Sequence, residues 1–136
     1  MSVIITHCAV RLGDNLVHLH FLRGLAKSYP DTHFIHFAHQ CYLPQLIELV
    51  SDLPNLYVRD LESVSKPATS AAEHWSMKPE GISSLDAWKN AGGAWERSPF
   101  RNDYARFMLS HFHALALTLG VTSPFNTPLD LLFDFP

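Results

Sequence analysis

The stretch from His7 to Asn15 combines residues suited to anion binding and proton transfer, at the point where a predicted strand turns into a predicted helix. Gly13 permits a tight backbone, and Asp14 and Asn15 are favoured helix caps. The free N–H groups at such a helix start attract anions, while the Asp14 carboxylate can accept a proton. We predict that this turn forms an open groove at the strands' carboxyl ends. Its predicted lining residues are Arg11, Gly13, Asp14, Asn15 and His18.

The helix that carries these residues is predicted to run from Asp14 to about Ser28, where Pro30 prevents its continuation. A broad arc of the helix is apolar, and His20, Arg23 and Lys27 fall on the opposite face. His18 lies within the apolar arc and therefore faces the sheet. Two interpretations stay open for His18, a core histidine bonded to backbone and a histidine that faces a ligand.

Strands and helices alternate over the first 60 residues. A β-branched run predicts a buried strand over Met1–Thr6, followed by strands at 34–38 and 56–60 and a helix at 43–50. Short βαβα connections imply a parallel sheet with right-handed crossovers. We expect an α/β, three-layer Rossmann-like domain over 1–136, with the first strand central and the next two on one side of it.

The segment 62–100 has little periodicity, apart from a short helix predicted near 84–91, yet it holds all three tryptophans. Trp75, Trp88 and Trp95 suit either sugar stacking or the anchoring of a long loop onto the body. A long helix is predicted over 102–119, with Gly120 as its stop. Residues 127–136 are predicted to form a final extended strand that leads towards a linker.

Composition limits the function classes. The 136 residues carry ten basic and thirteen acidic side chains, with no run of either sign, which argues against nucleic-acid binding. We identify no segment with the ~18 apolar residues of a membrane span, and no signal peptide. Two cysteines fit free thiols in a reducing cytoplasm. We expect one compact domain without a cofactor.

Nine histidines raise the question of a metal site. The local spacings argue against one, since the i, i+2 pairs on the helices diverge and the strand histidines alternate faces. One cluster stays open, because two neighbouring parallel strands end near the same edge of the sheet. It would be a Cys2His2 set made of His7, Cys8, His39 and Cys41.

Two parts of the chain resemble a known family. The run Arg11-Leu12-Gly13-Asp14 follows a buried strand and precedes a leucine-rich helix that ends in Leu22-Arg23-Gly24-Leu25-Ala26-Lys27-Ser28-Tyr29-Pro30-Asp31. The run Asp103-Tyr104-Ala105-Arg106-Phe107-Met108-Leu109, with Leu119-Gly120 and Leu129-Asp130-Leu131, resembles a last domain helix and the strand that enters an interdomain linker. Together they resemble the N-terminal half of GT-B glycosyltransferases of the heptosyltransferase kind, glycosyltransferase family 9. The Gly-Asp motif is short, and the segment between the two regions shows no usable similarity.

The resemblance implies the acceptor-binding half of an inverting glycosyltransferase. It would move a sugar from a nucleotide-sugar to a saccharide or lipopolysaccharide-type acceptor, with Asp14 as catalytic base and Gly13 near the diphosphate. Trp75 lies in the segment without usable similarity, and its expected role in substrate binding rests on sugar stacking alone. Most donor contacts in that family come from a second domain, so this half alone is expected to be inactive. The implied location is the cytoplasm, free or peripheral to the inner membrane. Arg11 departs from the small residues common in the family, so the loop is expected to contact phosphate or carboxylate, or to serve another acceptor.

Two interpretations from other classes stay open. The chain suits a stand-alone Rossmann-like module that binds a nucleotide or a protein without catalysis, and Asp14 suits a helix cap with no chemical role. A metal-binding domain is the third alternative.

Overall fold

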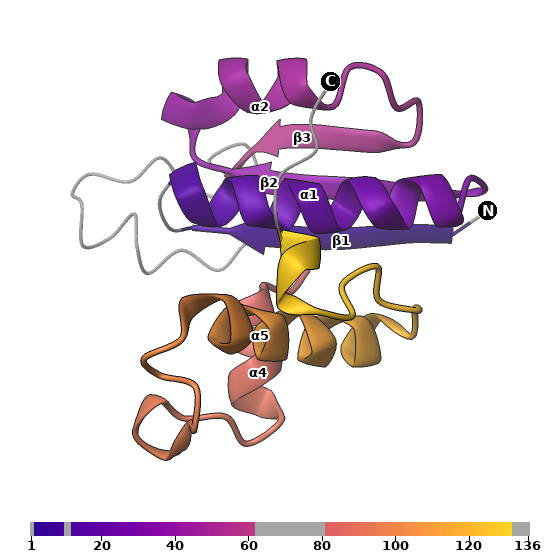
Figure 1. Ribbon diagram of the computed structural model, residues 1–136. Helices are drawn as coiled ribbons and strands as arrows, with labels where there is room; N and C mark the ends of the chain where they lie inside the picture. The colour runs from indigo at the N-terminus through magenta and orange to yellow at the C-terminus, as the bar shows by residue number, and fades with distance from the viewer. Residues whose placement is uncertain (1, 10–11, 62–80, 132–136) are drawn as a thin grey trace.

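The computed structural model describes residues 2–9, 12–61 and 81–131. Figure 1 shows a parallel sheet with a long helix packed across it and a pair of helices beyond one edge. The elements in chain order are β1 (Ser2–Cys8), α1 (Leu12–Ser28), β2 (Thr32–Ala38), η1 (Gln40–Tyr42), α2 (Leu43–Leu49), β3 (Leu56–Asp60), α4 (Ser84–Asn90), η3 (Trp95–Arg97), α5 (Tyr104–Leu119) and η4 (Pro128–Leu131).

The sheet confirms the predicted α/β, Rossmann-like fold class. β1 pairs in parallel with β2 from Ser2↔Thr32 to Cys8↔Ala38, and β2 pairs in parallel with β3. Helices lie on both sides, with α2 beyond β3 and the α4–α5 pair beyond β1 (Figure 1). All three strands therefore present their carboxyl ends at one edge, where parallel sheets bind ligands.

The predicted central position of β1 is wrong for the described residues, because the strand order is β1-β2-β3. On its other side β1 forms, within the described part of the chain, a one-residue parallel bridge, Thr6↔Ile82. The His7 N–H donates to the Ile82 carbonyl (3.3 Å) and the Ile82 N–H donates to the Ile5 carbonyl (3.4 Å). The pairing stops there because the Ser83 side chain caps α4, accepting from the Asp86 N–H.

Gly81 is required at this bridge. Its φ of 88° lies in the left-handed region, and a Cβ on Gly81 would overlap the backbone carbonyl of Ile5. The backbone of the 81–82 segment can therefore approach β1 only because residue 81 has no side chain.

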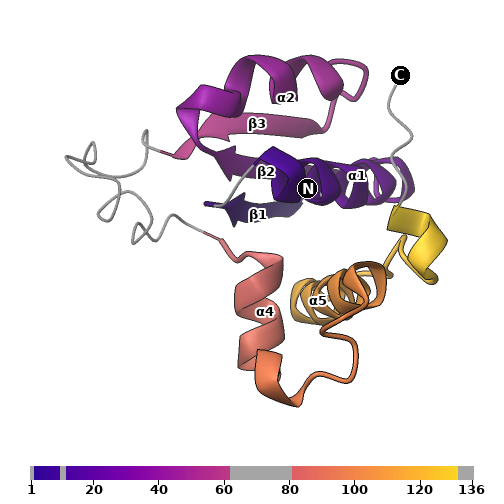
Figure 2. The same ribbon diagram turned by 60° about the vertical axis from the view of Figure 1, so that its left-hand side comes forward.

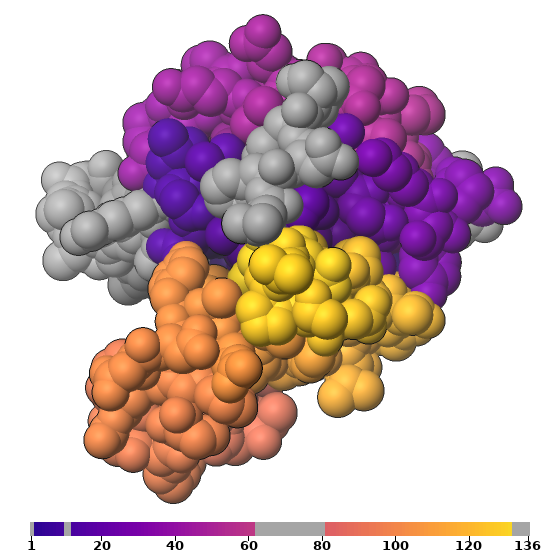
Figure 3. Space-filling model, in the orientation of Figure 1, coloured from indigo at the N-terminus to yellow at the C-terminus, as the bar shows by residue number. Residues whose placement is uncertain are grey.

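The predicted strand over 127–136 is wrong where the structure describes it. Pro128–Leu131 form the 3-10 helix η4, and residues 132–136 lie outside the described part. The Asp130 carboxylate accepts from the Asn126 N–H (2.7 Å) and the Thr127 N–H (2.9 Å), which closes a local turn. The His20 ring also bonds to the Asp130 carbonyl at 2.7 Å, so this yellow segment sits against α1 and α5 (Figure 3).

Three phenylalanines join α1 to α5 and to the loop after it. Phe21, Phe112 and Phe125 are buried, with ring centroids 4.9 Å apart for Phe21–Phe112 and 5.3 Å for each of the other two pairs. Offset and edge-on aromatic pairs of this kind add to the area they bury. The α4–α5 pair is therefore fixed to the body mainly through α5.

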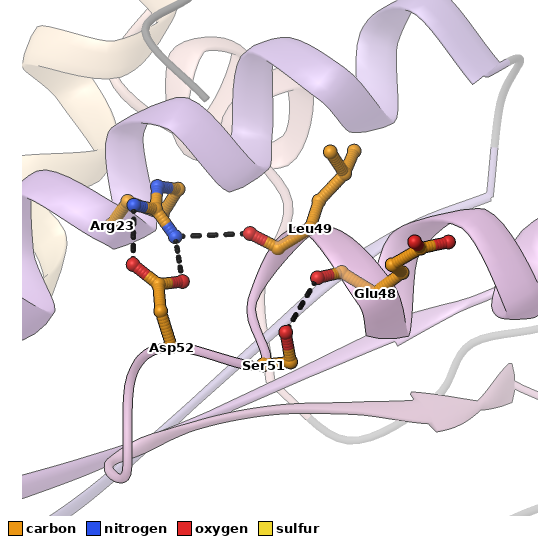
Figure 4. Close-up of polar contacts among 5 residues, drawn as sticks. All are labelled: Arg23, Glu48, Leu49, Ser51 and Asp52. Carbon is orange, nitrogen blue, oxygen red and sulfur yellow. Dashed lines mark hydrogen bonds and ion pairs between the residues drawn. The ribbon is translucent and has the colours of Figure 1, made fainter. Parts of the chain in front are cut away.

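Arg23 is buried, although the helical wheel placed it on the polar face of α1. Its guanidinium donates to both carboxylate oxygens of Asp52, at 2.6 and 2.9 Å, and to the Leu49 carbonyl at 2.9 Å (Figure 4). The hydrogen bonds from Arg23 hold the pKa of Asp52 below its usual range. A bidentate pair thus ties α1 to the end of α2, where Ser51 also donates to the Glu48 carbonyl (Figure 4).

Candidate functional site

A cleft of about 1100 Å³ opens where the sequence predicted a groove, at the carboxyl end of β1. One wall comes from the end of β1 and the start of α1. The other wall comes from α4, η3 and the start of α5, which lie side by side below β1 (Figure 2). We call the segment 81–111 the cleft wall and the segment β1–α1–β2–α2–β3 the body. Residues that line the cleft include His7, Asp14, His18, Asp86, Trp95 and Tyr104.

Asp14 reaches this cleft from the first turn of α1. The helix begins at Leu12, two residues before the predicted start, so Asp14 is a first-turn residue and not the residue before the helix. Its side chain is partly exposed. The Asp14 carboxylate also affects Tyr104, another residue that lines the cleft. Burial raises the pKa of Tyr104, and the negative charge of Asp14 raises it further. Asp14 therefore lies where its carboxylate could contact a ligand bound in the cleft.

The structure places the other predicted groove residues in different environments. Gly13 is exposed within α1, and a Cβ there would meet nothing within 4 Å. The expected tight turn at Gly13 is wrong, because the residue is helical. Asn15 is fully buried and its side-chain oxygen lies 3.1 Å from Nε2 of His36, so Asn15 supports the core and is not among the cleft-lining residues. Arg11 and Trp75 lie outside the described residues.

His18 forms part of the cleft floor and is 1% exposed. Its Nε2 lies 3.0 Å from the Ser84 hydroxyl, and its ring stacks on His36 at 5.2 Å. Its Nδ1 is buried without a hydrogen-bond partner among the described residues. Burial, reinforced by the neighbouring His36, holds the pKa of His18 well below its usual value, so the ring is neutral. The backbone-bonded alternative is therefore replaced by a side-chain contact to the cleft wall.

Behind His18, His36 completes a buried polar chain. Its Nδ1 lies 2.8 Å from the Thr6 hydroxyl and its Nε2 bonds to Asn15. Burial, with His7 nearby, lowers the pKa of His36 from 6.5 to about 3. The fold thus encloses two stacked, neutral histidines between the sheet and the cleft.

A histidine–carboxylate pair spans the cleft where the two walls meet. Nε2 of His7, at the end of β1, lies 3.4 Å from a carboxylate oxygen of Asp86 in the first turn of α4. His7 is buried, whereas the Asp86 side chain is half exposed. The sequence analysis missed this pair because it depends on the Thr6↔Ile82 bridge, which no local pattern signals.

Aromatic rings make up much of the cleft wall. The Trp88 ring stacks on His111 at 4.3 Å and meets Phe107 in a T-shaped contact at 5.2 Å. Trp95 packs on the same Phe107 at 5.3 Å but is 51% exposed. Of the two roles considered for the tryptophans, Trp88 has the packing role, while Trp95 packs and also presents surface to the cleft. Tyr104, which lines the same cleft, is 61% exposed.

The structure does not assemble the Cys2His2 set. Cys8 is buried whereas Cys41 is exposed, and Nε2 of His39 lies 2.7 Å from the Ala9 carbonyl. Within the described residues, no three or more histidine, cysteine, aspartate or glutamate side chains are arranged to hold a metal ion. Nor is any helix in those residues both long and apolar enough to cross a membrane.

Comparisons with known proteins add no assignment: no family model, no curated protein and no solved structure matches this chain.

Proposed function

We propose that this chain is the acceptor-binding half of an inverting glycosyltransferase, with Asp14 as the catalytic base. The observation that carries the proposal is the position of Asp14, a partly exposed carboxylate on a helix start that lines a cleft at the carboxyl end of β1. The Gly13-Asp14 motif also lies in the first of the two regions of the sequence that resemble glycosyltransferase family 9. The resemblance supplies the reaction class, and the cleft supplies a place where an acceptor would bind.

The size and lining of the cleft support a small polar ligand. A volume of about 1100 Å³ lies just above the usual range of ligand pockets, roughly 300 to 1,000 Å³. Its lining combines aromatic rings with carboxylate, imidazole, hydroxyl and amide groups. A saccharide needs both kinds of surface, since its C–H face is apolar and its hydroxyl groups each require a hydrogen-bond partner.

In the proposed reaction, the acceptor hydroxyl attacks the anomeric carbon of the nucleotide-sugar. The hydroxyl proton passes to the Asp14 carboxylate as the new C–O bond forms. The bond from the anomeric carbon to the diphosphate oxygen breaks, and the nucleoside diphosphate leaves with that electron pair. A single displacement of this kind inverts the anomeric configuration. His18, in the cleft floor, is neutral and adds no positive charge to the site.

The donor half of the site is proposed to come from a second domain. An acceptor domain alone would leave the reacting carbon unpositioned, and positioning is worth ~7 kcal/mol or more of the barrier. We expect no sugar transfer by the 136-residue chain and transfer by the full-length gene product.

Asp14→Asn in the full-length product tests the proposal. The amide keeps nearly the same volume but cannot accept the proton, so turnover should fall by about 10²-fold or more with little change in melting temperature. Transfer of radiolabelled sugar from a panel of nucleotide-sugars to saccharide and lipid-linked acceptors is the measurement. Asp31→Asn is the matched control, since Asp31 is exposed and is not a cleft-lining residue. Wild-type turnover by Asp14→Asn, or transfer by the 136-residue chain alone, would contradict the proposal.

A further inference from the structure

We propose that Trp95 and Tyr104 form the stacking platform of a subsite for a neutral pyranose, with Asp86 and Asn90 bonding its hydroxyl groups. This subsite rests on the proposed function, because it places the sugar residue of the acceptor on the cleft wall. It specifies where the sugar binds, that the sugar is uncharged, and which four residues bind it. None of these follows from the Gly-Asp motif.

The two rings are exposed. Trp88 and Phe107 of the cleft wall are half-buried, whereas Trp95 and Tyr104 are 51% and 61% exposed and both line the cleft. Trp95 is held from behind by its T-shaped contact with Phe107, which in turn packs on His111 at 4.5 Å. A ring that is fixed by its neighbours and open to a cleft loses little freedom when a ligand stacks on it. The electron-rich faces of such rings attract the polarised C–H groups of a pyranose.

Two polar side chains line the same cleft. Asp86 and Asn90 lie on one helix, α4, one turn apart. A carboxylate accepts two hydroxyl hydrogens, and an amide accepts one while donating to another oxygen. Vicinal hydroxyl groups of a pyranose would therefore find both donors and acceptors on α4.

The charge of the lining favours a neutral sugar over a nucleotide. Among the described residues that line the cleft are two carboxylates, Asp14 and Asp86, one guanidinium, Arg101, and no lysine. Burial lowers the pKa of His18 and of His111, and His7 already faces Asp86. Among these residues a diphosphate would find Arg101 as its one permanently cationic partner, whereas a neutral polyol can donate hydrogen bonds to Asp86.

The test is an NMR titration of the 136-residue chain with methyl glycosides of neutral hexopyranoses and of N-acetylhexosamine, and with their disaccharides. Indole N–H resonances report on each tryptophan, and Trp95→Phe assigns the signal of Trp95. We expect saturable shifts of the Trp95 signal, and we expect Trp95→Ala to weaken binding about tenfold. Phe100→Ala is the matched control, because Phe100 is an exposed aromatic residue of the same segment that is not among the cleft-lining residues. It should bind like the wild type.

Three results would overturn the subsite: no saturable binding by any saccharide, unchanged affinity in a folded Trp95→Ala variant, or perturbation of Trp95 by UDP or ADP but not by saccharides. A ¹⁵N spectrum of each variant establishes its folding before titration. Asp14→Asn separates this inference from the proposed function. The 136-residue Asp14→Asn variant should bind saccharide like the wild type, whereas the full-length variant should lose turnover. The binding result and the turnover result can therefore fail independently.

Discussion

The body and the cleft wall differ in how their residues are held. In the body, neighbouring strands pair over five or seven residues, and α1 is tied to α2 by a buried guanidinium. The cleft wall pairs with the sheet through one backbone bridge at Ile82, and is otherwise held by the His7–Asp86 and His18–Ser84 contacts and by α5. The body therefore has the redundancy of a sheet, whereas the cleft wall depends on a few contacts. The side of the cleft formed by β1 and α1 therefore follows from the sheet and its first helix. The opposite side is made of side chains whose positions local sequence patterns do not predict.

The largest expected effect is acid unfolding of both the body and the cleft wall. The His36 ring is held neutral in the folded chain, with a pKa lowered from 6.5 to about 3, and His18 is shifted in the same direction. Both histidines bind protons more readily when the chain is unfolded. The contribution of neutral His36 is complete above pH 6.5 and is lost as pH falls towards 3, and His18 acts in the same direction. His36 should therefore lower the free energy of unfolding by about 1.4 kcal/mol per pH unit in that window.

Urea denaturation between pH 4 and pH 8 measures this slope, and His36→Phe should reduce it. Since His36 belongs to the body and His18 contacts Ser84 of the cleft wall, hydrogen exchange should show both regions opening together in acid. A stability that does not change between pH 7 and pH 4.5 would show that the stacked pair is not a neutral, buried unit.

The intermediate effect is expected from Gly81→Ala, which should loosen the cleft wall alone. The new Cβ would overlap the Ile5 carbonyl at a residue with positive φ, so the bridge to β1 must shift. A strained backbone of this kind costs about 1 to 3 kcal/mol. Hydrogen exchange should rise in α4 while β2 and β3 keep their protection. Equal loss of protection in β2 would mean that the body and cleft wall open as one unit.

The smallest effect is expected from Gly13→Ala, which should stabilise the body. Gly13 is helical, exposed and surrounded by open space, so alanine adds helix propensity without a clash. The expected gain is about 0.5 to 1 kcal/mol, measured as a raised urea midpoint with an unchanged slope. Destabilisation would instead indicate that the start of α1 requires glycine, as the sequence analysis supposed.

The body could be predicted well because its signals are local. β-Branched runs and short connections predicted the strands and their parallel direction, and Gly120 stops α5 in the left-handed conformation, as predicted. Two errors, one at the start of α1 and one near the C-terminal end of the chain, have local causes. α1 starts two residues earlier than predicted because Gly13 adopts helical backbone angles and does not form the expected tight turn. Asp130 folds the expected last strand into η4 by accepting two backbone N–H groups.

The candidate site was only half predictable. The turn that presents Asp14 follows from the strand-to-helix change, but the opposing residues Asp86, Trp95 and Tyr104 come from segments with no strand pattern. Their place beside β1 depends on a single backbone bridge and on side-chain contacts between distant segments, such as those of Phe112 with Phe21 and of Ser84 with His18. A pattern within one segment carries no information about which distant segment a strand edge meets, so the lateral position of β1 and the His7–Asp86 pair could not be predicted.

The one-residue bridge at Ile82 also bears on how such a chain can diversify. Its two hydrogen bonds use only backbone atoms, so most side chains at position 82 would preserve them. Residues of α4 and η3 that face the cleft are mostly exposed and can be exchanged without emptying the core around Phe21. Ligand preference and stability are therefore largely separable traits. Random mutagenesis confined to the cleft wall should yield folded variants with altered selectivity far more often than the same mutation load placed in the body.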